Sequence, residues 1–204
     1  MWIRSSLDWN FDAHWRLAKH YPANLASSMN KANNKMVDLI QALKQQLLVL
    51  RQQKKDDFTR TVSVGDLLTD RWERARFEGW GEHSSCYDNV LVLGCVKVGC
   101  HTWIGPNCIL DGSGGILEIG SYCSIGSGVQ VYTHDTVAWS TSMGVEPFAK
   151  ASTKIGSGVY IGPNTVIQMG VSIGDRAVIG AMSFVNRDIP AGARAWGCPA
   201  RLQN

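Results

Sequence analysis

Aliphatic residues recur every six positions through the second half of the chain, in four groups of three. The members are Val98, Ile104 and Leu110; Ile119, Ile125 and Val131; Ile155, Ile161 and Ile167; and Ile173, Ile179 and Val185. Two positions before each stands a residue that is small or β-branched in nearly every unit, with Leu117 out of character. Residues two apart on an extended segment share a face, so each unit offers one large and one smaller side chain to a common interior. The period predicts short strands stacked around one core.

The residue after each aliphatic position adds a longer period of eighteen. Glycine follows the first two aliphatic residues of each group and a different residue follows the third: Gly99, Gly105, Asp111; Gly120, Gly126, Tyr132; Gly156, Gly162, Gln168; Gly174, Gly180, Asn186. Glycine tolerates tight corners that other residues resist. The sequence therefore predicts a coil of three short strands with two glycine corners and one corner of different chemistry, and four such coils stack into a triangular prism.

This pattern resembles the hexapeptide-repeat acyltransferases, and among them the sugar and polysaccharide O-acetyltransferases most. The resemblance covers about Leu93 to Leu202 and implies a left-handed parallel β-helix, since the period alone does not specify the handedness. The expected fold is mainly β, with an α-helical N-terminal region and cap over residues 1–90. The β-helix is expected over residues 91–204, with an extruded loop at about 132–153 and a C-terminal hook.

The N-terminal third carries a different pattern. A stripe spaced alternately four and three residues apart predicts a helix that packs on its neighbours or self-associates: Met36, Ile40, Leu43, Leu47 and Leu50. A second helix is expected from Asp66 to Gly79, placed to cap the open end of the β-helix. The aromatic opening of the chain, Trp2 to Tyr21, is expected to form core for the same region.

Two insertions leave the prism at the corner that lacks glycine. One adds three residues after Asp111, and the longer one separates Val131 from Ile155. A column of Asp111, Tyr132, Gln168 and Asn186 is expected there, with His134 projecting beside it. The longer segment is a whole number of six-residue units, but its Trp, Glu, Pro and Lys residues fit tight rungs poorly, so a loop is predicted. Loops rooted on a rigid solenoid are where binding and catalytic residues concentrate.

The pair Thr133-His134 at the root of this loop matches the pair that sugar O-acetyltransferases carry there. By that resemblance His134 is the general base, which takes the proton of a sugar hydroxyl as it attacks the thioester carbonyl of acetyl-CoA. Imidazole suits this task because its ordinary pKa lies near neutral pH. A backbone N–H of a neighbouring coil is expected to stabilise the oxyanion. Asp135 is expected to face solvent rather than the ring, because adjacent residues of an extended chain point apart.

The resemblance also implies where acetyl-CoA binds. Its pantetheine arm is expected along the edge between subunits of a homotrimer, and its phosphates near the C-terminal arginines; the implied cofactor-binding residues are Gly162, Pro163, Gly180, Ala181, Asn186, Arg187 and Arg201. Candidate acceptor contacts, taken from register and from the ability of tryptophan to stack on a sugar, are Asn107, Asp111 and Trp139. The alternative is that Asp111 only stabilises the turn in which it lies, that Trp139 packs within the loop, and that the arginines are exposed to solvent without a ligand.

Composition further narrows the classes of protein to which the chain could belong. A net charge of +3 with 18% charged residues gives no sign of a nucleic-acid surface, and no apolar run has the length of a secretion signal or membrane span. The six cysteines lack metal-finger spacing, which favours reduced thiols in a cytoplasmic protein. No metal is expected: the γ-type carbonic anhydrases share the prism but need three histidines for zinc, and the repeats offer only His101 and His134.

The sequence thus favours an acetyl-CoA-dependent O-acetyltransferase of a surface polysaccharide or its precursor, with His134 as base. One alternative is N-acetylation of a nucleotide-linked amino sugar, which uses nearly the same mechanism. The other is a β-helix with a purely structural role. Such a protein would need neither a Thr-His pair at the loop root nor the basic C-terminal segment, in which five cationic residues outnumber two acidic ones: Lys154, Arg176, Arg187, Arg194 and Arg201 against Asp175 and Asp188.

Overall fold

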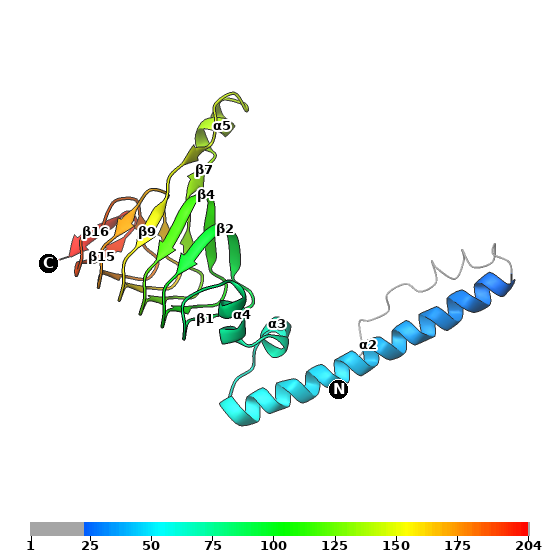
Figure 1. Cartoon of the computed structure of the whole chain (residues 1–204). Coiled ribbons are helices and arrows are strands. Elements are labelled where there is room, and N and C mark those ends of the chain that lie inside the picture. The colour runs from blue at the N-terminus through cyan, green and yellow to red at the C-terminus, as the bar shows by residue number, and fades with distance from the viewer. Residues whose placement is uncertain (1–22, 204) are drawn as a thin grey trace, which may run out of the picture. The chain divides into compact units, whose positions relative to one another are not determined.

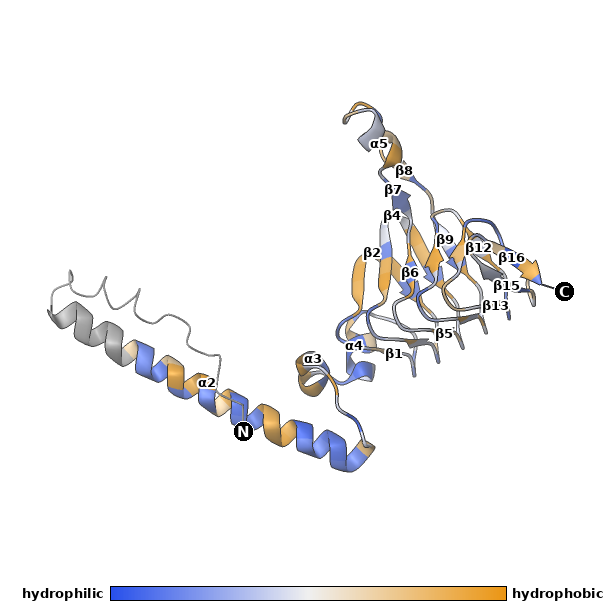
Figure 2. Ribbon diagram, turned by 180° about the vertical axis from the view of Figure 1, so that it is seen from behind, coloured by the Kyte–Doolittle hydropathy of each residue, from blue (hydrophilic) through white to orange (hydrophobic). Residues whose placement is uncertain are grey.

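The computed structural model describes residues 23–203, with side chains from residue 32 onward. Trp2 to Tyr21, expected to be aromatic core, lie outside the described residues. The chain divides into two compact units, residues 1–61 and residues 62–204. The described part of the first unit is the helix α2 (Ala23–Phe58). It contains the predicted stripe, whose members Met36, Ile40 and Leu43 are exposed, and hydrophobic and hydrophilic residues are interspersed along it (Figure 2). Self-association of this stripe remains a prediction.

The second unit is a parallel β-helix with two short helices before it and a projecting arm. Its helices are α3 (Val64–Leu68), α4 (Arg71–Phe77) and α5 (Val137–Thr141). Its strands are β1 (Ser85–Cys86), β2 (Leu91–Val98), β3 (Trp103–Ile104), β4 (Ile109–Ile119), β5 (Ser124–Ile125), β6 (Gln130–Val131), β7 (His134–Asp135), β8 (Ala149–Lys150), β9 (Thr153–Ile155), β10 (Tyr160–Ile161), β11 (Val166–Ile167), β12 (Ser172–Ile173), β13 (Val178–Ile179), β14 (Phe184–Val185), β15 (Arg194–Gly197) and β16 (Ala200–Gln203). Figure 1 shows the coils stacked one on another and the arm leaving one corner.

The strand pairing confirms the predicted register. Ile161 pairs with Ile179, and Ile155 with Ile173, each one coil apart in parallel. All twelve aliphatic residues of the six-residue period are buried, and of the residues two positions earlier only Val96 is not fully buried. These residues form one continuous core, whose hydrophobic strands are visible in Figure 2. Cys108 and Cys123 are buried members of it, as expected for small interior side chains.

The β-helix begins before the predicted boundary at residue 91. Strand β1 already pairs in parallel with β3, through Ser85 with Trp103 and Cys86 with Ile104. Trp80, Cys86 and Val92 continue the six-residue series backwards, with Trp80 and Cys86 buried and Val92 packed on the core. The sequence concealed this coil because a tryptophan and a cysteine stand in two of its aliphatic positions.

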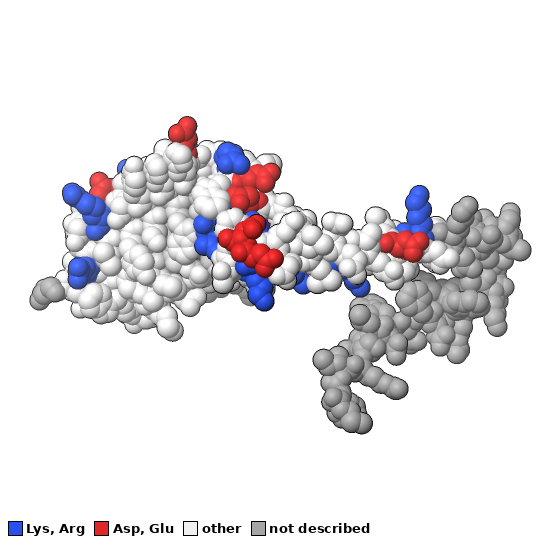
Figure 3. All heavy atoms as spheres, turned by 90° about the horizontal axis from the view of Figure 1, so that it is seen from below, with Lys and Arg blue, Asp and Glu red and all other residues white. Residues whose placement is uncertain are grey.

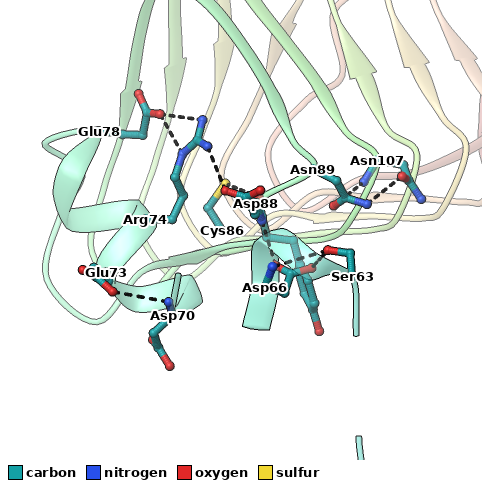
Figure 4. Close-up of polar contacts among 11 residues, drawn as sticks. Ser63, Asp66, Asp70, Glu73, Arg74, Glu78, Cys86, Asp88, Asn89 and Asn107 are labelled. Atoms are coloured by element: carbon teal, nitrogen blue, oxygen red, sulfur yellow. Dashed lines mark hydrogen bonds and ion pairs between the residues drawn. The ribbon is translucent and has the colours of Figure 1, made fainter. Parts of the chain in front are cut away.

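Two helices stand where one was predicted between Asp66 and Gly79. The break falls at Thr69 and Asp70, because Asp70 caps α4: its side chain accepts from Trp72 N at 2.8 Å, and Glu73 accepts from the backbone of Asp70 in a capping box (Figure 4). Helix α4 contacts β1, and its Ala75 is part of the buried core. This is the place at which the sequence predicted a cap.

A network of charged groups links this helical segment to the first coil. Arg74 bridges Glu78 at 2.8 Å and Asp88 at 3.5 Å, while Asp66 accepts a hydrogen bond from the backbone N–H of Asp88 at 2.8 Å (Figure 4). The side chain of Ser63 in turn donates to Asp66. Because these contacts join residues before the first strand to the turn after it, they fix the helical segment to the end of the β-helix.

One column of corner residues is aromatic. His83, His101 and Tyr122 stand two positions before mutually paired residues of successive coils, and their rings stack with centroids 4.7 Å apart at both steps. All three have left-handed backbone angles, with φ of 61°, 56° and 57°. The column continues with Gly158, which has no side chain to extend the stack. Stacking of this kind compensates for a backbone conformation that bulky residues adopt rarely.

The surface carries no concentrated basic region on the face of the β-helix seen in Figure 3, where charges of both signs are scattered. In the part of the chain that the structure describes, no helix combines the length and hydrophobicity that a membrane crossing requires.

All six cysteines of the chain are free thiols. Burial raises the pKa of Cys86 to about 12 and that of Cys108 to about 11, so both are neutral at physiological pH.

Candidate active site

The long insertion is an arm built on a two-stranded hairpin. His134 pairs with Lys150 and Asp135 with Ala149 in antiparallel fashion, and α5 lies near the tip between the two strands. The coils on either side of the arm pair directly with each other, since Ile125 pairs with Ile161. The repeat therefore resumes after the arm with its register unchanged, and the segment is extruded rather than an additional coil.

Strand β4 carries the shorter insertion and passes along the root of the arm. It pairs with β6 through Leu110 and Val131, and with β9 through Ile119 and Ile155. Asp111 and the residues after it thus run through the corner in extended conformation, in contact with β7 and β8. The register also places Tyr132, Gln168 and Asn186 in successive coils at this corner, following the paired residues Val131, Ile167 and Val185.

A carboxylate from this strand holds the imidazole of His134. Asp111 Oδ2 lies 2.8 Å from His134 Nδ1, and the Asp111 side chain is 2% exposed against 29% for that of His134. The other oxygen of Asp111 accepts hydrogen bonds from the backbone N–H and the hydroxyl of Ser113, at 2.9 Å and 2.5 Å. Ser113 Oγ also lies 3.3 Å from His134 Nδ1. With Nδ1 directed at the carboxylate, Nε2 is the nitrogen left to act on a ligand.

Thr133 ties the root of the arm to the same insertion. Its hydroxyl is fully buried, donates to the backbone carbonyl of Asp111 at 2.8 Å and accepts from Gly114 N at 3.0 Å. A Cβ on Gly114 would overlap the carbonyl of Thr133 and lie 2.5 Å from Cβ of His134. The Thr-His pair is therefore a structural unit, in which the threonine fixes the position from which the histidine projects.

Two of the acceptor candidates contact other side chains of the same chain. Asp111 is almost fully buried, with one carboxylate oxygen bound by Ser113 and the other directed at His134. Asn107 lies in a turn at a glycine corner, where its amide oxygen accepts from Asn89 Nδ2 at 2.8 Å (Figure 4). Register alone suggested that Asn107 neighbours the site, but it follows Ile104, whereas His134 projects from the corner that follows Leu110 and Val131.

Trp139 and Asp135 lie on the arm. Trp139 is 45% exposed and packs edge-on against Phe148, with ring centroids 5.5 Å apart. Asp135 accepts a hydrogen bond from Val137 N at 3.1 Å near the start of α5. Its paired position on β7 is adjacent to that of His134, so the two side chains point to opposite faces of the hairpin.

The implied cofactor residues fall into three groups. Pro163 and Ala181 are exposed and lie one coil apart in register at the second glycine corner, next to Gly162 and Gly180. Asn186 belongs to the corner of His134, and its Oδ1 is buried without a hydrogen-bond partner among the described residues. Arg187 is exposed after β14, and Arg201 is on β16, which forms the C-terminal hook with β15. Within one chain, Pro163 and Ala181 therefore lie at a different corner from His134.

The described residues hold no group of three or more His, Cys, Asp and Glu side chains that would suit a metal ion. His101, the other histidine of the repeats, is stacked between His83 and Tyr122 in the aromatic column. A surface hollow at the first glycine corner is lined by Lys154, Asp175 and Asp188, and it contains none of the candidate site residues.

The parallel coils and their six-residue units define the class of fold: the second unit is a left-handed parallel β-helix built from hexapeptide repeats. The family model described as bacterial transferase hexapeptide (six repeats) matches residues 152–187. The chain is 40% identical over 106 residues to a chloramphenicol acetyltransferase of Morganella morganii, an alignment that covers 42% of this chain and 49% of that protein. It is 52% identical over 48 residues to the galactoside O-acetyltransferase of Escherichia coli (strain K12), covering 24% of each.

A hexapeptide-repeat acetyltransferase of Vibrio cholerae O1 biovar eltor, solved with acetyl coenzyme A, has the same fold with a TM-score of 0.58 and 27% identity, over 81% of this chain and 87% of that one. These similarities confirm the resemblance to hexapeptide-repeat acyltransferases that the repeats and the Thr-His pair predicted. The chain spans about half or less of the length of the two curated relatives named above.

Proposed function

We propose that this protein is an acetyl-CoA-dependent acetyltransferase that transfers the acetyl group to a sugar hydroxyl of a surface polysaccharide or its precursor. The observation that carries the proposal is the Asp111–His134 pair at the root of the arm, with Nδ1 of the imidazole 2.8 Å from a buried carboxylate. Similarity to an acetyltransferase solved with acetyl coenzyme A and to a galactoside O-acetyltransferase supports the reaction class and the acceptor class.

In the proposed reaction His134 Nε2 accepts the proton of the acceptor hydroxyl while the hydroxyl oxygen attacks the thioester carbonyl carbon of acetyl-CoA. The Asp111 carboxylate fixes the Nδ1–H tautomer and stabilises the imidazolium that forms. Collapse of the tetrahedral intermediate breaks the C–S bond, and the imidazolium returns its proton to the departing thiolate. The products are the acetyl ester and coenzyme A. Backbone N–H groups of an adjacent coil would stabilise the oxyanion.

Acetyl-CoA would bind along the second glycine corner, over Gly162, Pro163, Gly180 and Ala181. The coils are closely stacked there: a Cβ on Gly162 would overlap Ala181 N, and one on Gly180 would lie 2.6 Å from Cβ of Trp196. The exposed Pro163 and Ala181 lie one coil apart, the arrangement that an extended pantetheine arm along the stack requires. Asn186, Arg187 and Arg201 would contact the nucleotide end, where arginine binds phosphate through several donors.

Because the acetyl-CoA edge and His134 belong to different corners of one prism, we propose a homotrimer. In this arrangement the edge of one subunit lies against the arm of the next, and each site takes its base and its acetyl-CoA contacts from two chains. Sedimentation or light scattering of the purified protein tests this assembly, and a monomer with full turnover would contradict it.

The test of the function is a thiol-release assay with acetyl-CoA across free sugars, nucleotide-linked sugars and oligosaccharides. His134→Ala is expected to lose roughly 10²–10⁴-fold in turnover, which is the usual contribution of general-base catalysis, while acetyl-CoA binding is retained. Asp135→Asn, on the opposite face of the arm, is the matched control and should keep wild-type turnover. No release with any acceptor together with no acetyl-CoA binding would overturn the proposal and favour a structural role.

The same assay separates the two transfer chemistries. Alkaline hydroxylamine removes the acetyl group from an ester product but leaves an amide intact. A labile product from a sugar supports O-acetylation, and a stable product from a nucleotide-linked amino sugar would identify N-acetylation instead.

A further inference from the structure

The hairpin of the arm sets a lysine beside the proposed base. His134 and Lys150 are directly opposite each other on β7 and β8. The ladder hydrogen bond belongs to the next pair, from Ala151 N to Thr133 O at 2.9 Å, so His134 and Lys150 form the non-hydrogen-bonded pair, in which side chains approach most closely. Directly opposed Cβ atoms of such pairs are roughly 4.5–5.5 Å apart on the same face of the sheet. The stem of Lys150 therefore starts next to the imidazole.

The charge of Lys150 is not neutralised within the described chain. Its side chain is exposed and forms no ion pair with residues 32–203. Of the two acidic residues next to His134 in sequence or space, Asp111 is buried and turned to the imidazole, and Asp135 points to the opposite face of the hairpin. Lys150 therefore contributes a positive charge, unpaired among the described residues, to the face of the hairpin that carries His134.

An aromatic pair lies further along the same arm. Phe148 stands two residues before Lys150, and alternate residues of an extended segment share a face. Phe148 packs edge-on against Trp139, and the two side chains are 44% and 45% exposed. The arm thus combines a base, a cation and a partly exposed aromatic surface.

We propose that Lys150 binds an anionic group of the acceptor, so that the acceptor is a sugar bearing a carboxylate or a phosphate rather than a neutral sugar. The inference rests on the proposed function, which it narrows to one acceptor class. An ammonium group is a strongly hydrated point charge suited to either anion, and a fixed charge at a site both attracts the matching ligand and repels cations. The aromatic surface of Trp139 and Phe148 would pack against the sugar ring. A hydroxyl of the same sugar would then remain accessible to His134.

Assays with three acceptors distinguish a carboxylate from a phosphate as the anion that Lys150 binds. They are a neutral oligosaccharide, an oligosaccharide of uronic acids, and a nucleotide-linked sugar. Wild-type kcat/KM should be highest for one of the two anionic acceptors. Lys150→Ala should raise the KM for that acceptor by roughly tenfold or more, as expected for loss of a hydrogen bond to a charged group, with the KM for acetyl-CoA and the rate with the neutral acceptor unchanged. Lys150→Glu should be worse, and Lys150→Arg should retain most of the affinity.

Lys154→Ala is the matched control. Lys154 is also exposed and only four residues away, but it lies on β9 in the coil rather than opposite His134. The proposal is overturned if Lys150→Ala weakens neutral and anionic acceptors equally, or if Lys154→Ala has the same effect as Lys150→Ala.

Direct binding distinguishes failure of this inference from failure of the proposed function. Calorimetric titration of the full chain with the uronic-acid oligosaccharide and with the nucleotide-linked sugar requires no catalysis. Binding of either ligand that is lost in Lys150→Ala and kept in Lys154→Ala supports the inference even if no acetyl group is transferred. Absence of binding of both ligands to the wild-type protein overturns it, even if thiol release with a neutral sugar confirms the enzyme.

Discussion

Asp111 Oδ2 and His134 Nδ1 lie 2.8 Å apart, although the carboxylate comes from β4 of one coil and the imidazole from the arm that leaves the next. The aspartate that follows His134 in the sequence, Asp135, faces away and binds Val137 N. A buried carboxylate fixed by Ser113 is a better partner for the imidazole than an exposed one, because it has already lost its water and its geometry is set by two hydrogen bonds.

Replacing Asp111 with asparagine should lower kcat by about 10²-fold, within the range attributed to an acid–base group. The amide keeps the shape of the side chain but loses the charge that stabilises the imidazolium, so the KM for acetyl-CoA should remain near the wild-type value. Steady-state kinetics measure both quantities. Asp135→Asn should have little effect, and an equal loss in the two variants would show that Asp111 does not act through His134.

Gly114→Ala should reduce turnover by at least about tenfold with a smaller effect on thermal unfolding, since a misplaced catalytic group is costly even when the fold persists. The added methyl group would meet the carbonyl of Thr133 and Cβ of His134, so the histidine must move. Gly115→Ala is a useful comparison, because its methyl group meets Ser152 at 2.9 Å instead. If Gly115→Ala impairs turnover as much as Gly114→Ala, displacement of His134 is not the cause.

The aromatic column should contribute measurably to stability. His101 stacks on both His83 and Tyr122, whereas Tyr122 has one aromatic neighbour in the column. His101→Ala is therefore expected to lower the free energy of unfolding by about 1–3 kcal/mol, and Tyr122→Ala by about half as much, at roughly 0.5–1.5 kcal/mol for each aromatic pair. Urea titration measures both. A larger loss for Tyr122→Ala would contradict the view that stacking is additive along the column.

Stability should decline at alkaline pH because of the buried thiols. Burial raises the pKa of Cys86 from 9.0 to about 12 and that of Cys108 to about 11, so the folded state holds these protons more tightly than the unfolded chain. The stabilisation is complete below pH 9 and is lost as the pH rises toward 11 or 12. Urea unfolding under reducing conditions between pH 8 and 11 should show this fall. Cys86→Ala should flatten it, and an unchanged slope would assign the effect to other groups.

The regular part of the fold could be read from the sequence because each coil repeats one local rule. Ile155 and Ile161 point inward for the same reason that Ile173 and Ile179 do, and a one-residue slip would expose an entire set of aliphatic side chains. The coil that contains Trp80 and Cys86 was missed because it obeys the rule with atypical residues. The helix expected from Asp66 to Gly79 was interrupted by the capping preference of Asp70, a local signal that the apolar pattern obscured.

The position of the candidate site could be predicted from the sequence, but the contacts among its residues could not. The same register that correctly placed the arm also suggested Asn107 and Asp111 as ligand contacts, and the structure gives both of them partners within the chain. The sequence pattern did not single out Lys150, which lies sixteen residues after His134 near the end of the arm. Only the hairpin pairing reveals that the two residues face each other.

The sequence by itself determined the period of the coil, the residues of its core and the corner from which the arm projects, because burial of apolar side chains at fixed spacing is a local property of an extended chain. Only the tertiary structure decided that Asp111 holds His134, that Thr133 anchors it and that Lys150 stands opposite. Those contacts join segments from different coils and from the two strands of the arm. Their geometry depends on how the coils stack and how the arm folds back on itself, which no single stretch of sequence specifies.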